Sequence, residues 1–235
     1  MEEEKKTNGL KEVTKELLGW EDNKLFRTLN HLTTRPGQIV TAYCKGEKSK
    51  YLSPVVYFFG VAALDYFINS ISGFMDFTLK SNSESLRKTF SNPIFANSGI
   101  DVSGILDQMN SVFSFMISDT GQNITQVPIF LLATWFLYKR YNRSFKENSW
   151  FALYTLGHVT LLSIPLILYW YITKDMFLNN WVSFIIGLGY WVWTSKQFYN
   201  LTTRKAILLG ILMLATLGLI MTFVPIIMIL IMQFI

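Results

Sequence analysis

Long apolar runs dominate the chain after about residue 50. A helix needs roughly 20 apolar residues to cross about 30 Å of hydrocarbon, and four of the runs are long enough. These four cover residues 52–72, 150–172, 177–195 and 206–234. A fifth run, residues 124–138, is shorter and contains Pro128. The pattern predicts an all-α integral membrane protein with four or five spans.

The positions of Lys and Arg decide between four and five spans, because cytoplasmic loops collect these residues close to the span ends. With five spans and the N-terminus inside, 17 of the 21 Lys and Arg lie on the cytoplasmic side. Without a span at 124–138, the split becomes eleven inside and ten outside, which is no bias. We therefore expect five spans, with the N-terminus inside and the C-terminus outside.

The hydrophilic parts divide into a head and one long outer loop. Residues 1–51 form the expected cytoplasmic head, and residues 52–235 form the five-span helical domain. Leucines at helical spacing over residues 9–32 predict one or two amphipathic helices that rest on the membrane surface or against the spans. The outer loop, residues 73–123, is expected to be irregular in its first half. Residues 105–117 predict a one-sided helix that lies across the outer ends of the spans.

A basic turn, which contains Lys45, Lys48 and Lys50, precedes the first span. Pro36 favours the start of a short helix over residues 36–44, and Gly46 favours its end in a left-handed cap. Ser53 and Pro54 then supply a cap and a first position for the first span. Five residues of this stretch are candidates for binding lipid headgroups or a partner protein: Arg35, Lys45, Lys48, Lys50 and Tyr51. Simple anchoring, worth about 1 kcal/mol for each cation near an anionic leaflet, is the alternative explanation.

The same stretch resembles the signature of a known family. The residues Arg35-Pro36-Gly37, Tyr43, Gly46, Tyr51 and Pro54 follow the pattern RPG-x5-Y-x2-G-x4-Y-x2-P. This pattern is similar to that of domain-of-unknown-function family 3667, whose members are bacterial multi-span membrane proteins. The resemblance implies a place in the bacterial cytoplasmic (inner) membrane and a structural role for these residues, here called the box. Many members carry a cysteine-rich zinc ribbon before the box, and this chain has none. The five-span plan also resembles the Yip-type family, by topology alone.

Two ionisable side chains fall within the expected spans, Asp65 and His158. Such groups are costly in a bilayer and usually face the bundle interior or water. Asp65 lies roughly 20 Å along its span and His158 roughly 12 Å along its own, at 1.5 Å per residue. The offset of about 8 Å is too long for direct contact, although one water could bridge it. A proton-linked pair in a small transporter is one interpretation, and separate hydrogen bonds within the bundle are the other.

The sequence lacks the usual signatures of an enzyme or a metal site. Cys44 is the one cysteine, and the chain has two histidines, so the common zinc ligand sets are excluded. Gly-rich phosphate loops in a helix-opening context, nucleophile elbows and His-Glu-x-x-His helices are missing. The basic loops also lack the aromatic stacking platform that nucleic acid requires. We expect no enzyme activity, no cofactor, no metal and no nucleic-acid partner.

Together these features favour a non-catalytic membrane scaffold or adaptor. Its expected partners are anionic lipid headgroups, and either a membrane-protein partner or further copies of the chain. The alternative is a small proton-linked transporter or permeation pathway that uses Asp65 and His158. A filled bundle would favour the scaffold, and a water-accessible cavity reaching both residues would favour transport.

Overall fold

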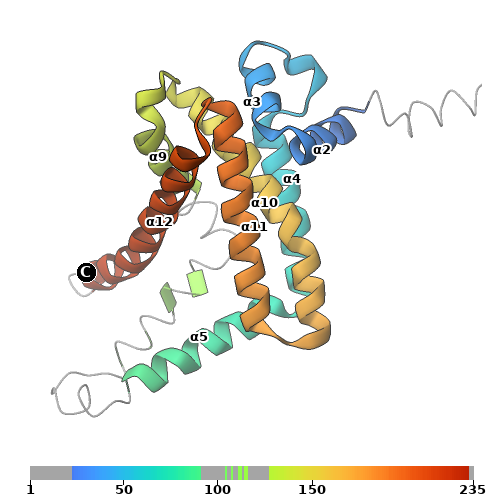
Figure 1. Cartoon of the computed structure of the whole chain (residues 1–235). Helices are drawn as coiled ribbons and strands as arrows, with labels where there is room; N and C mark the ends of the chain where they lie inside the picture. The colour runs from blue at the N-terminus through green and yellow to red at the C-terminus, as the bar shows by residue number, and fades with distance from the viewer. Residues whose placement is uncertain are drawn as a thin grey trace, which may run out of the picture.

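A computed structural model describes residues 23–90, residues 127–232 and six single positions between these ranges. The six are residues 104, 107, 111, 112, 114 and 115. Over this described part the chain is helical and contains no strand (Figure 1). The expected all-α class is therefore confirmed.

Helices occupy each of the five segments that the hydropathy pattern selected. In chain order the elements are α2 (Lys24–Thr34), α3 (Pro36–Cys44), η1 (Lys48–Lys50), α4 (Pro54–Ser72), α5 (Phe74–Phe90), α9 (Val127–Tyr138), η3 (Lys139–Tyr141), α10 (Phe145–Thr173), α11 (Met176–Phe198) and α12 (Thr203–Met232). Of these, η1 and η3 are single 3-10 turns. Two helical stretches of the described part, Lys48–Ser72 and Phe145–Thr173, are long and apolar enough to cross a membrane.

Local sequence explains where the first helices begin and end. Helix α3 runs from Pro36 to Cys44, as the sequence predicts, and Gly46 follows it with a φ of +100°. Ser53 caps α4 by accepting a hydrogen bond of 3.2 Å from the Val56 N–H, and Pro54 takes the first helical position. The basic turn therefore lies between two helices whose ends are fixed by their own residues.

Helices α4 and α10 run side by side in the same direction. At their beginnings, the Tyr154 hydroxyl of α10 donates a hydrogen bond to the Leu52 carbonyl, just before α4. At their ends, Phe74 packs against the Trp170 ring with centroids 4.8 Å apart. The start of α4, where α2 and α3 also lie, is here called the head end, and the other end is called the far end (Figure 1).

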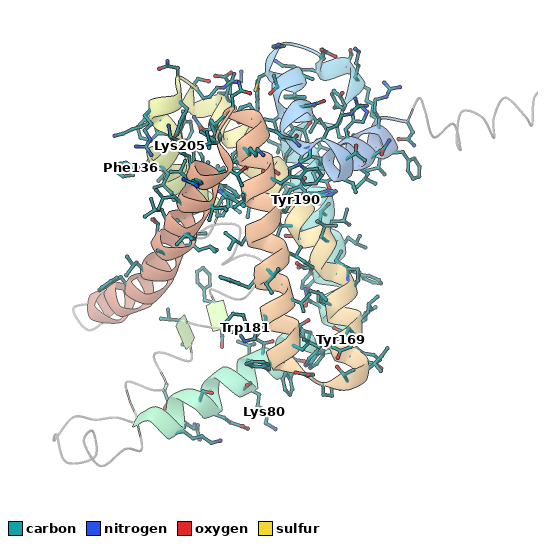
Figure 2. The ribbon with its side chains drawn as sticks, viewed as in Figure 1. Lys80, Phe136, Tyr169, Trp181, Tyr190 and Lys205 are labelled. Carbon is teal, nitrogen blue, oxygen red and sulfur yellow. The ribbon has the colours of Figure 1, made fainter. Side chains whose placement is uncertain are left out.

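The remaining long helices alternate in direction between these two ends. Helix α11 returns to the head end, where Phe198 stacks on Phe151 of α10 at 5.4 Å. Helix α9 also ends there, because Tyr138 stacks on Tyr199 at 4.3 Å. Helix α12 begins at the head end, directly after α11, and runs away from it. In Figure 2, Lys205 and Tyr190 accordingly lie nearer the head end, and Lys80 and Tyr169 nearer the far end.

One expectation about the outer loop was wrong. The first half of residues 73–123 is not irregular, because α5 occupies Phe74–Phe90. Gly73, with a φ of +69°, separates it from α4. Asp76 in its first turn and Arg87 and Lys88 in its last turn complement the helix dipole, which offsets the weak propensity of its Ser and Asn residues. Most of the predicted helix at 105–117 lies outside the described residues.

The core of the head end is aromatic. Five rings contact one another there: Tyr138, Phe151, Trp191, Phe198 and Tyr199. All five are buried, and the Trp191 indole N–H donates to the Tyr138 hydroxyl at 2.9 Å. This cluster joins α9, α10 and α11, so it fixes the platform on which α2 and α3 lie.

Candidate functional site

The box residues attach the head to the bundle, beginning with Gly37. Its backbone N–H donates a hydrogen bond of 3.0 Å to the Gln197 side-chain oxygen at the end of α11. A Cβ atom added to Gly37 would lie 2.3 Å from the Gln197 Cβ and 2.6 Å from the Phe198 nitrogen. Only glycine allows α3 to approach α11 this closely.

The two box tyrosines are both buried at the same junction. The Tyr43 ring meets Trp150 edge-on at 5.0 Å and Tyr154 at 5.9 Å, which seats α3 against α10. The Tyr51 hydroxyl lies 3.0 Å from Nδ1 of His31, which ties the basic turn to α2. These contacts come from residues that the sequence placed in one signature, and they give each tyrosine a packing role.

His31 lies between Arg35 and Tyr51. Arg35 donates from Nη2 to His31 Nε2 at 2.8 Å, so the ring proton of neutral His31 must reside on Nδ1 and point to the Tyr51 oxygen. Burial lowers the pKa of His31, and the charges of Arg35 and Arg27 lower it further. The neutral form of this histidine is therefore the one that fits the head.

His158 occupies the contact between the bundle and α2. Its Nδ1 atom lies 2.7 Å from the Tyr57 hydroxyl of α4, and its Nε2 atom lies 3.2 Å from the Thr33 hydroxyl of α2. The Thr33 hydroxyl donates to the Leu29 carbonyl at 2.8 Å, so it accepts the Nε2 proton of His158. Tyr57 then donates to Nδ1. The histidine side chain is 1% exposed, and every proton in this chain of bonds has an acceptor.

Asp65 does not share this site with His158. It accepts a hydrogen bond of 3.0 Å from the Asn69 side chain on the same helix. The Tyr57 partner of His158 lies eight residues earlier on α4, which corresponds to about 12 Å along the helix axis. Both ring nitrogens of His158 have partners other than Asp65.

A polar cavity of about 670 Å³ opens beside this junction. Its lining comes from α2, α3, the basic turn, the segment before α10 and the end of α11, and consists of His31, Arg35, Gln38, Ile39, Thr41, Ala42, Lys45, Glu47, Tyr51, Arg143, Gln197, Phe198 and Asn200. Three of the five residues that the sequence selected for lipid or partner binding meet here, namely Arg35, Lys45 and Tyr51. Sequence reasoning missed Arg143 and Gln197, because nothing local connects them to the box.

The other two basic candidates lie outside the cavity. Lys50 forms a salt bridge of 2.8 Å with Glu47 across one turn of η1. Its hydrogen bond and its charge lower the pKa of Glu47, and Glu47 in turn raises the pKa of Lys50. Lys48 lies 5.2 Å from the centroid of the Trp150 ring. Lys146 lies at the same distance from that ring, so Lys48 belongs to a separate cation–π group.

The bundle contributes further hydrogen bonds that the sequence did not single out. The Tyr190 hydroxyl of α11 donates to the Leu32 carbonyl of α2 at 2.9 Å. The Leu52 N–H donates to the Thr28 hydroxyl at 3.0 Å. The detectable signal was the presence of Tyr57, Tyr154 and Tyr190 within apolar runs, because a buried hydroxyl needs a partner.

The lone thiol and the metal-ligating residues do not form a reactive site in the described part of the chain. Burial raises the pKa of Cys44 to about 12, so its thiolate is scarce at neutral pH. Among residues 23–90 and 127–232, no group of three or more His, Cys, Asp or Glu side chains could hold a metal ion.

The fold and the site define an all-helical chain with helices apolar enough to cross a membrane and a small head docked on them. Residues 22–65 match the model of the family described as a protein of unknown function, DUF3667. The matched range covers α2, α3, the basic turn and residues 54–65 of α4, so the suspected resemblance to this family is confirmed over residues 22–65. No curated protein and no solved structure matches the chain.

Proposed function

We propose that this protein is a non-catalytic scaffold or adaptor of the bacterial cytoplasmic membrane. Helices α4, α9, α10, α11 and α12 would cross the bilayer, with the head on the cytoplasmic side. Two features support this arrangement. The five helices alternate in direction between the head end and the far end, and 17 of the 21 Lys and Arg fall on the head side of such a plan. The head would present its surface to lipid headgroups or to a partner protein.

Helix α9 is the short member of this plan. Its 12 residues extend about 18 Å, whereas the hydrocarbon core is about 30 Å thick. A complete fifth crossing therefore needs the residues that precede Val127. The proposal includes this requirement, and the labelling experiment argued at the end of the Discussion tests it.

The observation that carries the adaptor proposal is the use of His158 to hold the head. An ionisable residue in a span is usually a sign of transport chemistry. Here the neutral ring is hydrogen-bonded on one side to Tyr57 of α4 and on the other to Thr33 of α2. The side chain therefore supports a fixed orientation between the head and the bundle, and pre-organised surfaces bind partners at lower entropic cost.

The transport alternative retains one observation in its favour. A continuous hydrogen-bond chain leads from Thr33 on α2 through His158 to Tyr57 on α4. This chain ends about 12 Å along α4 from Asp65, which is bonded to Asn69 instead. A proton pathway would have to bridge that distance with water.

Proton flux into proteoliposomes separates the two functions. The purified protein is reconstituted with an internal pH-sensitive dye, and a potassium diffusion potential drives proton uptake. We expect no uptake above that of protein-free vesicles, for wild type and for Asp65→Asn alike. Uptake by the wild type that Asp65→Asn abolishes would overturn the adaptor proposal in favour of transport.

Site-specific photo-cross-linking tests the adaptor role directly. A photoreactive amino acid replaces the exposed Gln38 at the cavity, and a matched control replaces Phe67, which is 59% exposed on α4. In native membranes we expect a discrete adduct with one protein or one lipid species at position 38, and only non-selective lipid labelling at position 67, which would face the acyl chains. Identical labelling patterns at the two positions would contradict a binding role for the head.

A further inference from the structure

The cavity beside the box has the size and polarity of a small-molecule site. Its volume of about 670 Å³ falls within the range of about 300–1,000 Å³ that is typical of such sites. Its walls come from five separate segments of the chain, which the buried contacts of Gly37, Tyr43 and Tyr51 hold together. The cavity is therefore formed by the fold and does not belong to a single loop.

The charges that face this cavity are predominantly positive. The Lys45 ammonium group has no hydrogen bond or ion pair with the described part of the chain, although its charge helps to lower the pKa of Glu47. Arg35 donates one N–H to the uncharged His31, and among the described residues its other guanidinium N–H groups have no acidic partner. The one carboxylate in the lining, Glu47, is engaged by Lys50 from outside the cavity. Burial lowers the pKa of His31 most, and the charges of Arg35 and Arg27 lower it further, as a positive potential at this place would.

The rest of the polar lining adds further hydrogen-bond donors, from Gln197 and Arg143. The Gln197 oxygen is occupied by the Gly37 N–H, so the amide NH2 group of Gln197 is left as a donor. Arg143 is the third cation of the lining, although it also contacts Glu147 at 3.3 Å and donates to the Phe198 carbonyl at 3.3 Å. A guanidinium fork, an ammonium group and amide donors are the set that recognises phosphate oxygens.

We propose that this cavity binds a phosphate ester, with Lys45 and Arg35 as its principal contacts. Tyr51 in the cavity wall lies three residues before Pro54, where α4 begins, so the site lies at the level at which a span enters the membrane. The phosphate group of a lipid and that of a soluble metabolite share this chemistry. The inference deepens the proposed function and rests on it, because it names the ligand class of the same head.

The test uses the full chain and a pair of matched double variants. Arg35→Gln with Lys45→Gln removes two charges from the cavity, whereas Lys48→Gln with Lys146→Gln removes the two charges beside the Trp150 ring, outside the cavity. The soluble probe is glycerol 3-phosphate, added at constant ionic strength and followed by the thermal shift of the purified protein. The lipid probe is phosphatidylglycerol in phosphatidylcholine nanodiscs, followed by native mass spectrometry of the retained lipid.

We expect the cavity variant to lose binding by about tenfold or more, and the outside variant to stay within about twofold of wild type. The single variant Lys45→Gln, which disturbs no internal contact, should show part of the loss. Retention of the lipid without a shift by glycerol 3-phosphate assigns the site to a headgroup, and a shift by the soluble ester assigns it to a metabolite.

Equal losses in the two double variants, or no binding of either probe by the wild type, would overturn the proposal. The binding assays do not depend on proton flux or on cross-linking to a partner. A failed phosphate site would therefore leave the adaptor proposal standing. Proton uptake by the wild type that is lost in Asp65→Asn would overturn the adaptor proposal. Phosphate binding measured in the separate assays would still stand.

Discussion

At the scale of single residues, both histidines act as neutral connectors, His31 within the head and His158 between the head and the bundle. His31 accepts from Arg35 and donates to Tyr51 within the head. His158 accepts from Tyr57 and donates to Thr33 across the head and the bundle. In each case the two ring nitrogens have different roles, which only the uncharged ring can fill with these partners.

Tyr57→Phe tests the connector role of His158. The change removes the donor to Nδ1 and leaves a buried nitrogen without a partner, which costs about 1–3 kcal/mol of unfolding free energy. We expect a clear fall in the melting temperature of the purified protein, measured by intrinsic fluorescence. The matched control, Tyr66→Phe, alters a tyrosine that is 48% exposed and should change stability by less than about 0.5 kcal/mol. Equal effects of the two changes would show that the Tyr57 hydroxyl is dispensable.

The lowered pKa of His31 predicts that acid weakens the head. A depressed pKa means that the folded state binds the proton less well than the unfolded state does, so stability rises with pH over this interval. The stability that the neutral His31 ring gives to the folded state is fully present above about pH 6.5, and it is lost as the pH falls through the lowered pKa. The charged neighbours are Arg27 and Arg35, and Tyr51 faces the ring as a neutral partner.

Melting temperatures at about pH 7.5 and pH 5.5 measure this effect. We expect the fall between the two values to be smaller in His31→Gln than in the wild type, because the other titrating groups are common to both proteins. A fall that is as large in His31→Gln as in the wild type would assign the acid sensitivity to other residues.

At the scale of elements, the approach of α3 to α11 makes the head a fixed part of the molecule. Gly37 lies at a tight contact between them, and its neighbours Gln197 and Phe198 include backbone atoms that cannot rotate away. Because cores are close-packed, one added methyl group at such a point must displace a whole helix.

Gly37→Ala measures that constraint. The added carbon would lie 2.6 Å from the Phe198 backbone nitrogen, so α3 or α11 must shift, at a cost of about 1–3 kcal/mol. We expect a lower melting temperature and easier proteolysis of the head. Gly60→Ala is the control, since a Cβ there meets nothing within 4 Å and alanine favours a helix by up to about 1 kcal/mol. A Gly37→Ala protein as stable as Gly60→Ala would exclude the tight contact.

How far the sequence predicts these elements depends on whether their determinants are local. The bounds of α3 and the start of α4 follow from Pro36, Ser53 and Pro54, and the structure confirms them. Helix α5 was missed because its support comes from Trp170, which meets Phe74 and Phe77 from a distant part of the chain. The Ser and Asn residues of this segment, read along the sequence, give no sign of a contact with a residue so far away.

The candidate site was predictable only in part for the same reason. Arg35, Lys45 and Tyr51 were found from the box, and they do line one cavity. Lys48 and Lys50 are near them in sequence, yet the turn directs Lys48 to Trp150 and Lys50 to Glu47. The walls supplied by α11 and by the segment before α10 depend on packing between segments about 100 or more residues apart, which composition and spacing do not encode.

At the scale of the whole molecule, the two ends differ in charge and in structure. The head end carries α2, α3, the basic turn and η3, whereas the far end carries α5 and the turn between α10 and α11 (Figure 1). A helical bundle with one basic end is oriented by the positive-inside rule, so the head end should face the cytoplasm. Whether segment 124–138 crosses decides whether α5 and η3 lie on opposite sides of the membrane.

Cysteine labelling at three exposed positions resolves this point. Asn30→Cys lies on α2, Glu84→Cys on α5 and Arg140→Cys on η3. Native Cys44 contributes little background, because burial raises its pKa to about 12 and maleimides react with the thiolate. We expect a membrane-impermeant maleimide to label position 84 in intact cells, and positions 30 and 140 only after the membrane is opened.

This pattern requires one crossing between residues 30 and 84 and another between residues 84 and 140. The first is α4, and the second is the one that the sequence assigns to segment 124–138, which includes α9. If position 140 were labelled in intact cells together with position 84, segment 124–138 would not cross, and the chain would have four spans with its termini on the same side. If position 30 were labelled as well, the head would face outward, and the basic turn would lose its role as the cytoplasmic anchor.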